Sequence, residues 1–308
     1  MIMLKVSVIV PVYNRELTIE RTIKSVLNQT FRNFELIIVN DGSIDGSLET
    51  VTDYAKKDNR IKVFSQNNSG VSMARNKGIR KALGKYICFL DSDDTYELSF
   101  LEKMVSAAEK SNADVTYSGH FHLYNNKKKS VRFKFVKEKI FLNYLKNKTT
   151  PNTNSWMIRK SFLEENKILF EVDNNLGEDM LFFSSILCLQ PTVAYVKEQL
   201  TNYYMNTENS LSKDIDNKIT SDIFWMNKLC EIIAESNIQE EIKGKLISII
   251  VGYRLPVGII NTINAMPVSK SEKISELKKY RGIIKRMRLV NGVRSIKGFL
   301  MFIKIYLK

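Results

Sequence analysis

The stretch KYICFLDSDD, residues 85–94, joins an apolar run to three aspartates within four positions. The run at residues 86–90 is typical of a buried strand. Carboxylates packed this closely repel one another, so they need a compensating positive charge. Asp91 and Asp93 offer hard oxygen ligands one residue apart, which suits Mg²⁺ or Mn²⁺ shared with the phosphates of a substrate. An acidic turn that caps a helix beginning near Leu98 is the alternative.

Strands and helices alternate through the first 120 residues. Helical periodicity separates apolar runs that predict strands at residues 6–13, 34–39, 61–66, 85–90 and 113–121. This alternation predicts an α/β fold built on a mostly parallel, doubly wound sheet with flanking helices.

The edge where the parallel strands end is the place where such sheets bind ligands. Polar, small and acidic residues follow four of the predicted strands, namely Pro11-Val12-Tyr13-Asn14, Asn40-Asp41-Gly42-Ser43, Asn67-Asn68-Ser69-Gly70 and Asp91-Ser92-Asp93-Asp94. The chain contains neither GxGxxG nor GxxxxGK followed by Ser or Thr, so a glycine-rich phosphate loop of either kind is not expected. The carboxylates predict instead that this edge holds phosphate through a metal.

The pattern changes twice further along the chain. It becomes less regular after about residue 122, and helical periodicity without strand signals returns at about residue 215. The sequence therefore predicts a ligand-binding half of one domain at 1–120, a second half of that domain at 121–214, and a helical, basic and amphipathic C-terminal region at 215–308.

Composition indicates an ordinary globular protein of 308 residues, with 44% hydrophobic and 26% charged residues. The three cysteines, Cys88, Cys188 and Cys230, are far apart and form no CxxC, which favours a reducing compartment over a disulfide framework or a zinc site. The apolar N-terminus lacks a basic segment and a cleavage motif, so it is interpreted as a strand and not as a signal peptide.

Membrane-spanning segments are not expected, because no stretch reaches the roughly 18 uncharged apolar residues that a span needs. The nearest stretch, residues 246–260, carries Arg254 and Pro256.

The net charge of +14 is concentrated near the end of the chain. Residues 269–308 contain 12 Lys and Arg against 2 Glu, whereas the rest of the chain is nearly balanced. A basic protein could bind nucleic acid, but here the excess lies in a terminal segment and not across a whole domain. This charge leaves open the hypothesis of a basic protein that binds nucleic acid or a membrane and has no enzymatic activity.

Several motifs in a fixed order give a more specific hypothesis. They are VSVIVPVYN, the QTF stretch before FELIIVNDGSIDGS, the segment SGVSMARNKGIRKALGKYICFLDSDD, and GED at residues 177–179. In this combination the chain resembles the family 2 glycosyltransferases, which have the GT-A fold. The resemblance is strong over residues 5–120 and thinner through about residue 212.

The resemblance implies a hexosyltransferase that uses a nucleotide-sugar donor, usually a UDP-sugar, with Mn²⁺ or Mg²⁺ and inversion at the anomeric carbon. It places Pro11, Tyr13 and Asn14 in the nucleoside pocket, Asp93 on the metal, and Asp91 and Ser92 beside the ribose and the metal. The donor-binding set that follows from it is Pro11, Val12, Tyr13, Asn14, Asn40, Asp41, Gly70, Arg75, Asp91, Ser92 and Asp93.

Two of these positions leave alternatives open. Arg75 could support the donor pocket by direct contact or by bracing Asp91, or it could form an ordinary helix-to-sheet salt bridge. Asn40 stands where many relatives have an aspartate that accepts the uracil N3 hydrogen. An Asn carbonyl can accept the same bond, so uridine remains feasible, and Asp41 is retained.

Asp179 of the GED motif matches the general base of the family, which removes the proton of the acceptor hydroxyl. The alternative is a helix start enriched in acidic residues. Glu178 could contact the acceptor, and Trp156 could stack on a sugar or belong to the core. Residues 209–212 occupy the position of a loop that closes over the donor in relatives. His120 and His122 form an HxH pair for which packing is favoured over metal binding.

Residues 282–307 mix apolar side chains with Lys and Arg, a pattern that favours an amphipathic helix on an anionic membrane surface. A helical cap on the catalytic domain is the alternative. The resulting hypothesis is a cytoplasmic enzyme, peripheral on the inner membrane face, that builds capsule or another surface polysaccharide on a saccharide or polyprenyl-linked acceptor without binding nucleic acid. Apolar segments of the C-terminal region could also pair in a homo-oligomer.

Overall fold

The computed structural model describes residues 4–125, 127–172, 177–205 and 215–288, and the chain divides into two compact units that interleave along the sequence. The first unit comprises Met1–Lys139, Thr149–Asp173 and Pro191–Glu208, and the second comprises Ile140–Lys148, Asn174–Gln190 and Asn209–Lys308. The division predicted at residues 120 and 214 follows chain order, whereas these units follow spatial contacts, so the two do not coincide.

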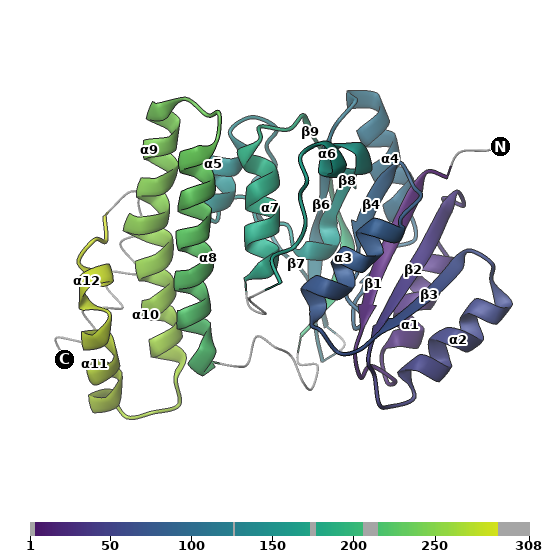
Figure 1. Cartoon of the computed structure of the whole chain (residues 1–308), viewed down its shortest axis with the longest axis horizontal. Helices are drawn as coiled ribbons and strands as arrows, with labels where there is room; N and C mark the ends of the chain where they lie inside the picture. The colour runs from purple at the N-terminus through teal and green to yellow at the C-terminus, as the bar shows by residue number, and fades with distance from the viewer. Residues whose placement is uncertain (1–3, 126, 173–176, 206–214, 289–308) are drawn as a thin grey trace. The chain divides into compact units, whose positions relative to one another are not determined.

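The first unit is built on a nine-stranded sheet in the order β3-β2-β1-β4-β8-β6-β9-β5, with β7 beside β6 (Figure 1). β1 to β4 are parallel, β8 runs antiparallel between β4 and β6, and β6 is parallel to β9. The strands are β1 (Val6–Val12), β2 (Phe34–Asp41), β3 (Ile61–Gln66), β4 (Tyr86–Phe89), β5 (Thr95–Tyr96), β6 (Val115–Tyr124), β7 (Lys127–Ser130), β8 (Trp156–Arg159) and β9 (Val193–Tyr204).

Hydrophobic burial explains why these segments form the centre of the sheet. All residues of β1 and β2 are buried, as expected for parallel strands covered on both faces. The predicted α/β fold with a mostly parallel sheet is confirmed. The short strand β8 was not predicted, and it joins the parallel part of the sheet to β6.

Helices of the first unit cover the sheet. They are α1 (Ile19–Leu27), α2 (Ser47–Lys57), α3 (Val71–Lys81), α4 (Phe100–Ser111) and α6 (Lys160–Glu165), with a short 3-10 helix at Thr153–Ser155. In α1 the spacing of Ile19, Ile23 and Val26 buries one face. α3 lies on β1 and β2, where a Cβ at Gly78 would be 2.4 Å from Ile9, so only glycine permits this close approach.

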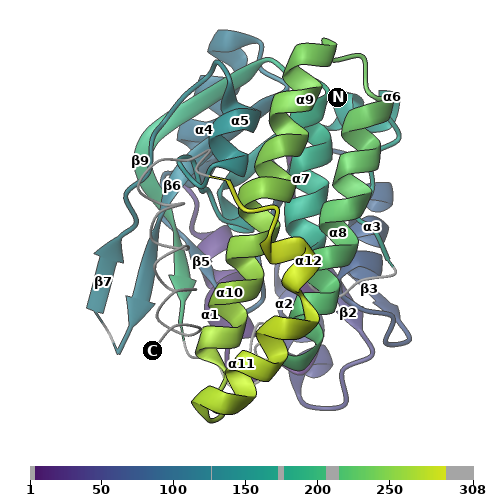
Figure 2. The same ribbon diagram turned by 90° about the vertical axis from the view of Figure 1, so that its left-hand side faces the viewer.

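The second unit is helical in its described part (Figure 2). Its elements are α5 (Ile140–Leu145), α7 (Glu178–Cys188), α8 (Ile215–Glu235), α9 (Glu240–Ile249), a π-helical turn (Ile250–Arg254), α10 (Leu255–Ala265), α11 (Lys270–Lys279) and α12 (Arg281–Ile284). α7 packs against α5 and α8, and α10 packs against α8. Most of residues 282–307, the predicted membrane-binding segment, lies outside the described residues.

The continuous helix Glu240–Ala265 contains the stretch that comes nearest to a membrane span in the sequence. Its most apolar window has a mean hydropathy of 1.7, so by length and composition it is apolar enough to cross a membrane despite Arg254. However, 61% of that window is buried inside the structure, as in the core helix of a folded unit. Such a helix is weak evidence for a membrane span.

Candidate active site

Asp41 organises one part of the edge where the parallel strands end. Its carboxylate accepts hydrogen bonds from Gln66 Nε2 (2.8 Å) and from the backbone N–H groups of Ser69 (2.9 Å) and Gly70 (2.9 Å). Gly70 has φ +88°, a conformation that favours glycine, and α3 begins directly after it. Asp41 therefore fixes the loop between β3 and α3, and both Asp41 and Gly70 lie at the predicted ligand edge.

The ends of β1 and β2 are joined by side chains. Asn14, with φ +50°, accepts a hydrogen bond from Ile44 N–H (3.0 Å) and donates its own N–H to Ser43 Oγ (3.1 Å). Asn40 is buried, and its carbonyl oxygen accepts from Ser43 N–H at 3.3 Å. Pro11 and Val12 are also buried, whereas the Tyr13 side chain is 42% exposed and available to a ligand.

Arg75 reaches the aspartate loop from α3. Its Nη2 lies 2.8 Å from Asp91 Oδ1, and the guanidinium stacks 5.0 Å from the centre of the Phe170 ring. Asn154 accepts the backbone N–H of Asp91 at 2.9 Å. This ion pair is compatible both with bracing of Asp91 and with an ordinary helix-to-sheet salt bridge, the two alternatives in which Arg75 does not touch the donor.

Two further arginines, Arg15 and Arg21, contact the loop at Asp93, and neither was predicted from the sequence. Arg15 Nε lies 3.7 Å from Asp93 Oδ2, and Arg21 Nη2 donates to the Asp93 carbonyl oxygen at 2.6 Å. Arg21 also stacks 3.8 Å from the centre of the Tyr204 ring. These cations offset part of the repulsion among the aspartates. Arg15 follows VPVYN directly, but nothing local in the sequence indicates that it faces a residue 78 positions away.

Asp94 differs from its two acidic neighbours because its side chain is fully buried. It accepts hydrogen bonds from the Tyr204 backbone N–H (2.8 Å) and from Asn154 Nδ2 (2.6 Å). Burial, and then the charges of Asp91 and Asp93, raise the pKa of the Asp94 carboxyl well above its usual range. Asp94 therefore ties the loop to β9 and leaves Asp91 and Asp93 as the carboxylates that can meet a ligand.

The aspartate loop fits a divalent ion that is shared with a substrate. Within the described ranges no group of three or more His, Cys, Asp or Glu side chains could enclose a metal. Asp91 and Asp93 offer hard oxygen ligands, whereas the third carboxylate of the loop, Asp94, is buried and hydrogen-bonded to Tyr204 and Asn154. This donor set suits Mg²⁺ or Mn²⁺, because these ions complete their shells with water and phosphate oxygens.

His120 and His122 are not such a site. Their rings lie 5.3 Å apart beside Phe133, and His120 is buried. Burial, followed by the neighbouring His122, lowers the pKa of His120 to about 4. The pair is part of an aromatic cluster, which agrees with the packing that the sequence favoured.

The GED motif lies in the second unit, at the start of α7. Gly177 has φ +83°, and a Cβ there would be 2.4 Å from the Trp225 ring of α8. Asp179 is half-buried and accepts the Met180 N–H at 2.7 Å. Its charge also contributes to raising the pKa of Tyr144, although burial of that phenol is the larger cause. Glycine is needed at position 177 because of both the positive φ and the close Trp225 ring. The GED motif therefore has a role in packing, in addition to any role of its two acidic side chains.

The two acceptor candidates differ in their surroundings. Trp156 is fully buried in β8 with its ring 5.4 Å from Tyr117, so the core alternative describes its position. Glu178 is half-buried beside Asp179. Residues 209–212, the predicted closing loop, lie outside the described residues.

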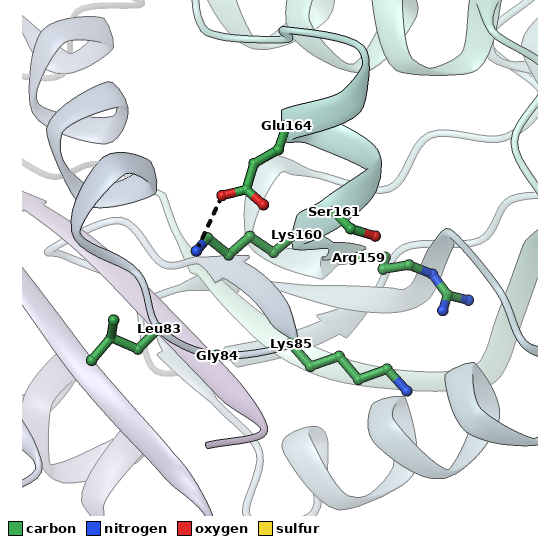
Figure 3. Close-up of a pocket in the computed structure, with 7 residues that line it drawn as sticks. All are labelled: Leu83, Gly84, Lys85, Arg159, Lys160, Ser161 and Glu164. Carbon is green, nitrogen blue, oxygen red and sulfur yellow. Dashed lines mark ion pairs between the residues drawn. The ribbon is translucent and has the colours of Figure 1, made fainter. Parts of the chain in front are cut away.

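A shallow depression of about 250 Å³ lies elsewhere on the first unit, where β4 begins and β8 ends (Figure 3). Its basic side chains have acidic partners: Lys160 pairs with Glu164 (3.2 Å), Lys85 with Glu109 (2.8 Å), and Arg159 with Asp114. The depression therefore offers little unpaired charge to a ligand. It is lined by Leu83, Gly84, Lys85, Arg159, Lys160, Ser161 and Glu164.

The mostly parallel sheet, with a carboxylate-rich loop after β4, defines an α/β protein. Residues 7–167, just over half of the chain, match the model of the family Glycosyl transferase family 2. EpsH of Bacillus subtilis is 31% identical over 287 residues, which cover 91% of this chain and 82% of that protein. The chain therefore belongs to glycosyl transferase family 2 and is a glycosyltransferase.

Other relatives extend these findings. The cholesterol galactosyltransferase of Borreliella burgdorferi is 34% identical over 217 residues, which cover 65% of this chain and 59% of that protein, so less than two thirds of that relative is spanned.

Solved structures share the fold. S. aureus TarS 1-349, in complex with UDP-GlcNAc, has a TM-score of 0.70 at 21% identity, with 93% of this chain and 90% of that chain covered. The mannosyltransferase PcManGT from Pyrobaculum calidifontis, in complex with GDP-Man and Mn²⁺, has a TM-score of 0.62 at 14% identity, covering 98% and 86%. At these identities the likeness concerns the fold, and it agrees with the GT-A architecture.

Proposed function

We propose that the protein transfers a sugar from a nucleotide-sugar donor, with a UDP-sugar as the first choice, to a hydroxyl of a saccharide or polyprenyl-linked saccharide, with inversion at the anomeric carbon. The observation that carries this proposal is the aspartate loop. Asp91 and Asp93 lie at the ends of parallel strands, where such sheets bind ligands, and Arg75 braces Asp91 from α3. Donor complexes of TarS and PcManGT support a nucleotide sugar.

Residues at the strand ends would hold the donor. Asp93, with Asp91 beside it, would bind Mn²⁺ or Mg²⁺, which when bound neutralises charge on the departing diphosphate. Tyr13 is exposed enough to pack on the nucleoside, and Ser92 lies between the two candidate metal ligands. The Asn40 side chain accepts a hydrogen bond within its own turn, and Asp41 accepts two from the loop before α3, so both residues would act on the base partly by fixing the shape of the pocket.

Asp179 would act on the acceptor. Its carboxylate takes the proton of the acceptor hydroxyl while the oxygen of that hydroxyl bonds to the anomeric carbon. The bond from this carbon to the diphosphate oxygen breaks at the same time, and the nucleoside diphosphate leaves with the electron pair. Attack from the face opposite the leaving group inverts the configuration. No separate acid is required, because the diphosphate is already a good leaving group.

The setting proposed for this reaction is the cytoplasmic face of the membrane. Lipid-linked saccharides there would serve as precursors of capsule or of another surface polysaccharide. Residues 282–307, rich in apolar side chains with Lys and Arg, would hold the enzyme there.

Thermal unfolding with UDP, GDP, CDP and TDP, each with and without Mn²⁺, tests the donor assignment. Ligands that bind the native state raise the unfolding midpoint according to RT ln(1 + [L]/Kd). We expect a shift with UDP only when Mn²⁺ is present. A shift with GDP alone would redirect the donor assignment to GDP-sugars, and no shift with any nucleotide would contradict it.

A further inference from the structure

Arg254 lies in a π-helical turn within the long helix of the second unit. Pro256 provides the reason for this turn, because proline has no N–H for the carbonyl four residues earlier and its ring crowds that carbonyl. The carbonyl in question belongs to Gly252, and it accepts the backbone N–H of Arg288 at 2.7 Å instead. Short π-helical segments within α-helices are frequent at functional sites.

The Arg254 guanidinium has few strong partners. It donates to Asn147 Oδ1, and it makes long contacts with the Tyr144 carbonyl oxygen (3.5 Å) and with Met180 Sδ (3.6 Å). Its centre lies 5.9 Å from the centre of the Trp225 ring. Throughout the described part of the chain, no carboxylate comes within ion-pair distance of this cation. Burial lowers the pKa of Arg254, and nearby groups that include Asp222 and Asp179 oppose that shift.

The surroundings of Arg254 connect it to the proposed base. Met180, which it contacts, follows Asp179 directly, and Trp225 packs on the Gly177 turn that begins α7. The charge of Asp179 acts on both Arg254 and Tyr144. All these residues belong to the second unit, and within it the Arg254 guanidinium lies 3.6 Å from the sulfur of Met180, the residue that follows Asp179.

We propose that Arg254 binds an anionic group of the acceptor, a phosphate or a carboxylate, beside the hydroxyl whose proton Asp179 takes. This assignment rests on the proposed function of Asp179. A half-buried cation without an ionic partner is unfavourable unless something compensates it, and a guanidinium matches the oxygens of a phosphate or carboxylate in a bidentate geometry. The competing explanation is structural: Arg254 caps the carbonyl end of α5 through Tyr144 and Asn147.

Tryptophan fluorescence of the full-length protein distinguishes these explanations. The chain has two tryptophans, and Trp225 lies near Arg254 whereas Trp156 is buried in the first unit. Titration with inorganic phosphate, against chloride at matched ionic strength, should give a saturable change that Trp225→Phe removes. Parallel titration with acetate would show whether a carboxylate binds instead.

Variants of Arg254 carry the decision. Arg254→Met should abolish the change, and Arg254→Lys, which keeps the charge but loses the fork, should weaken apparent affinity about 10-fold. Arg281→Met, an exposed arginine of α12, should leave the response unchanged. A response that persists in Arg254→Met, or a wild-type protein that answers neither anion, would overturn the proposal.

Two further measurements keep the outcome decisive. If Arg254→Met fails to fold, an unweakened phosphate affinity in Arg254→Lys contradicts bidentate binding. The shift of the unfolding midpoint by UDP with Mn²⁺ should survive every Arg254 variant. If the wild-type protein shows no midpoint shift with UDP and Mn²⁺, the donor proposal alone is contradicted. If it shows no fluorescence response to phosphate or acetate, the acceptor proposal alone is contradicted.

Discussion

At the scale of single residues, the aspartate loop shows how three similar side chains acquire different tasks. Asp94 is buried and ties the loop to β9, Asp91 pairs with Arg75, and the Asp93 carboxylate lies 3.7 Å from Arg15. Asp93 is the carboxylate that the proposed function assigns to the divalent ion.

Replacement of Asp93 by Asn should lower transfer activity by about 10²-fold or more, because the proposed metal loses a charged ligand at the leaving group. The Mn²⁺-dependent shift of the unfolding midpoint by UDP should disappear, while stability without ligands stays near the wild-type value. Asp58→Asn, which breaks the Asp58–Arg60 pair outside this site, is the matched control. Retention of the UDP shift in Asp93→Asn would exclude Asp93 as the main ligand.

His120 permits a prediction about pH. Its pKa is lowered from 6.5 to about 4, so the unfolded chain binds a proton between these values that the folded protein does not. Stability should therefore fall as the pH decreases from about 6.5 to about 4, by at most about 3 kcal/mol from this group. His120→Phe should lose less stability over that range, as measured by urea unfolding at several pH values. Parallel curves for the two proteins would contradict this account.

At the scale of elements, the parallel strands could be predicted because each is an apolar run with a polar end. β8 could not: its four residues follow an irregular segment, and its pairing with β4 and β6 is non-local. For the same reason no local pattern indicated that Asn154 serves both Asp91 and Asp94, or that Arg254 lies near Met180. Local sequence motifs therefore indicated where strands end. They did not indicate which side chains from distant elements come together in the fold.

The start of α7 gives a prediction at this scale. Gly177→Ala places a methyl group against the Trp225 ring and puts alanine at an unfavourable positive φ. We expect the free energy of unfolding to fall by about 2–4 kcal/mol, and transfer activity to fall as well. Gly244→Ala is the control, since nothing lies within 4 Å of its Cβ position in α9 and the change should stabilise by about 0.5–1 kcal/mol. Equal effects at both glycines would refute the role of the Trp225 contact.

At the scale of the whole molecule, positive charge is concentrated near the end of the sequence. The residues proposed to bind the donor and to act as the base belong to segments of nearly balanced charge, whereas residues 289–308 contain four basic and no acidic residues among many apolar ones. This arrangement supports membrane attachment through the final segment.

Truncation after residue 288 should reduce binding to vesicles that contain anionic lipid by 10-fold or more, since each basic residue near such a surface contributes about 1 kcal/mol. Added salt should weaken binding of the full-length chain. The UDP and Mn²⁺ shift should be unchanged, which serves as the control for folding. If the truncated chain sediments with these vesicles as completely as the full-length chain does, the proposal of membrane attachment is wrong.

The interleaving of the two units has a consequence for biosynthesis. α5 and α7 leave the ribosome long before α8 and α10, the helices that cover α7 or complete its unit. At about 5–20 residues per second, the stretch from the end of α7 to the end of α10 takes roughly 4–15 s to make. During that interval α7, which carries the apolar residues Leu181, Phe182 and Phe183, lacks some or all of the later helices of its unit, so the nascent chain is expected to need chaperones, and a message cut short before α8 is expected to yield a product prone to aggregate.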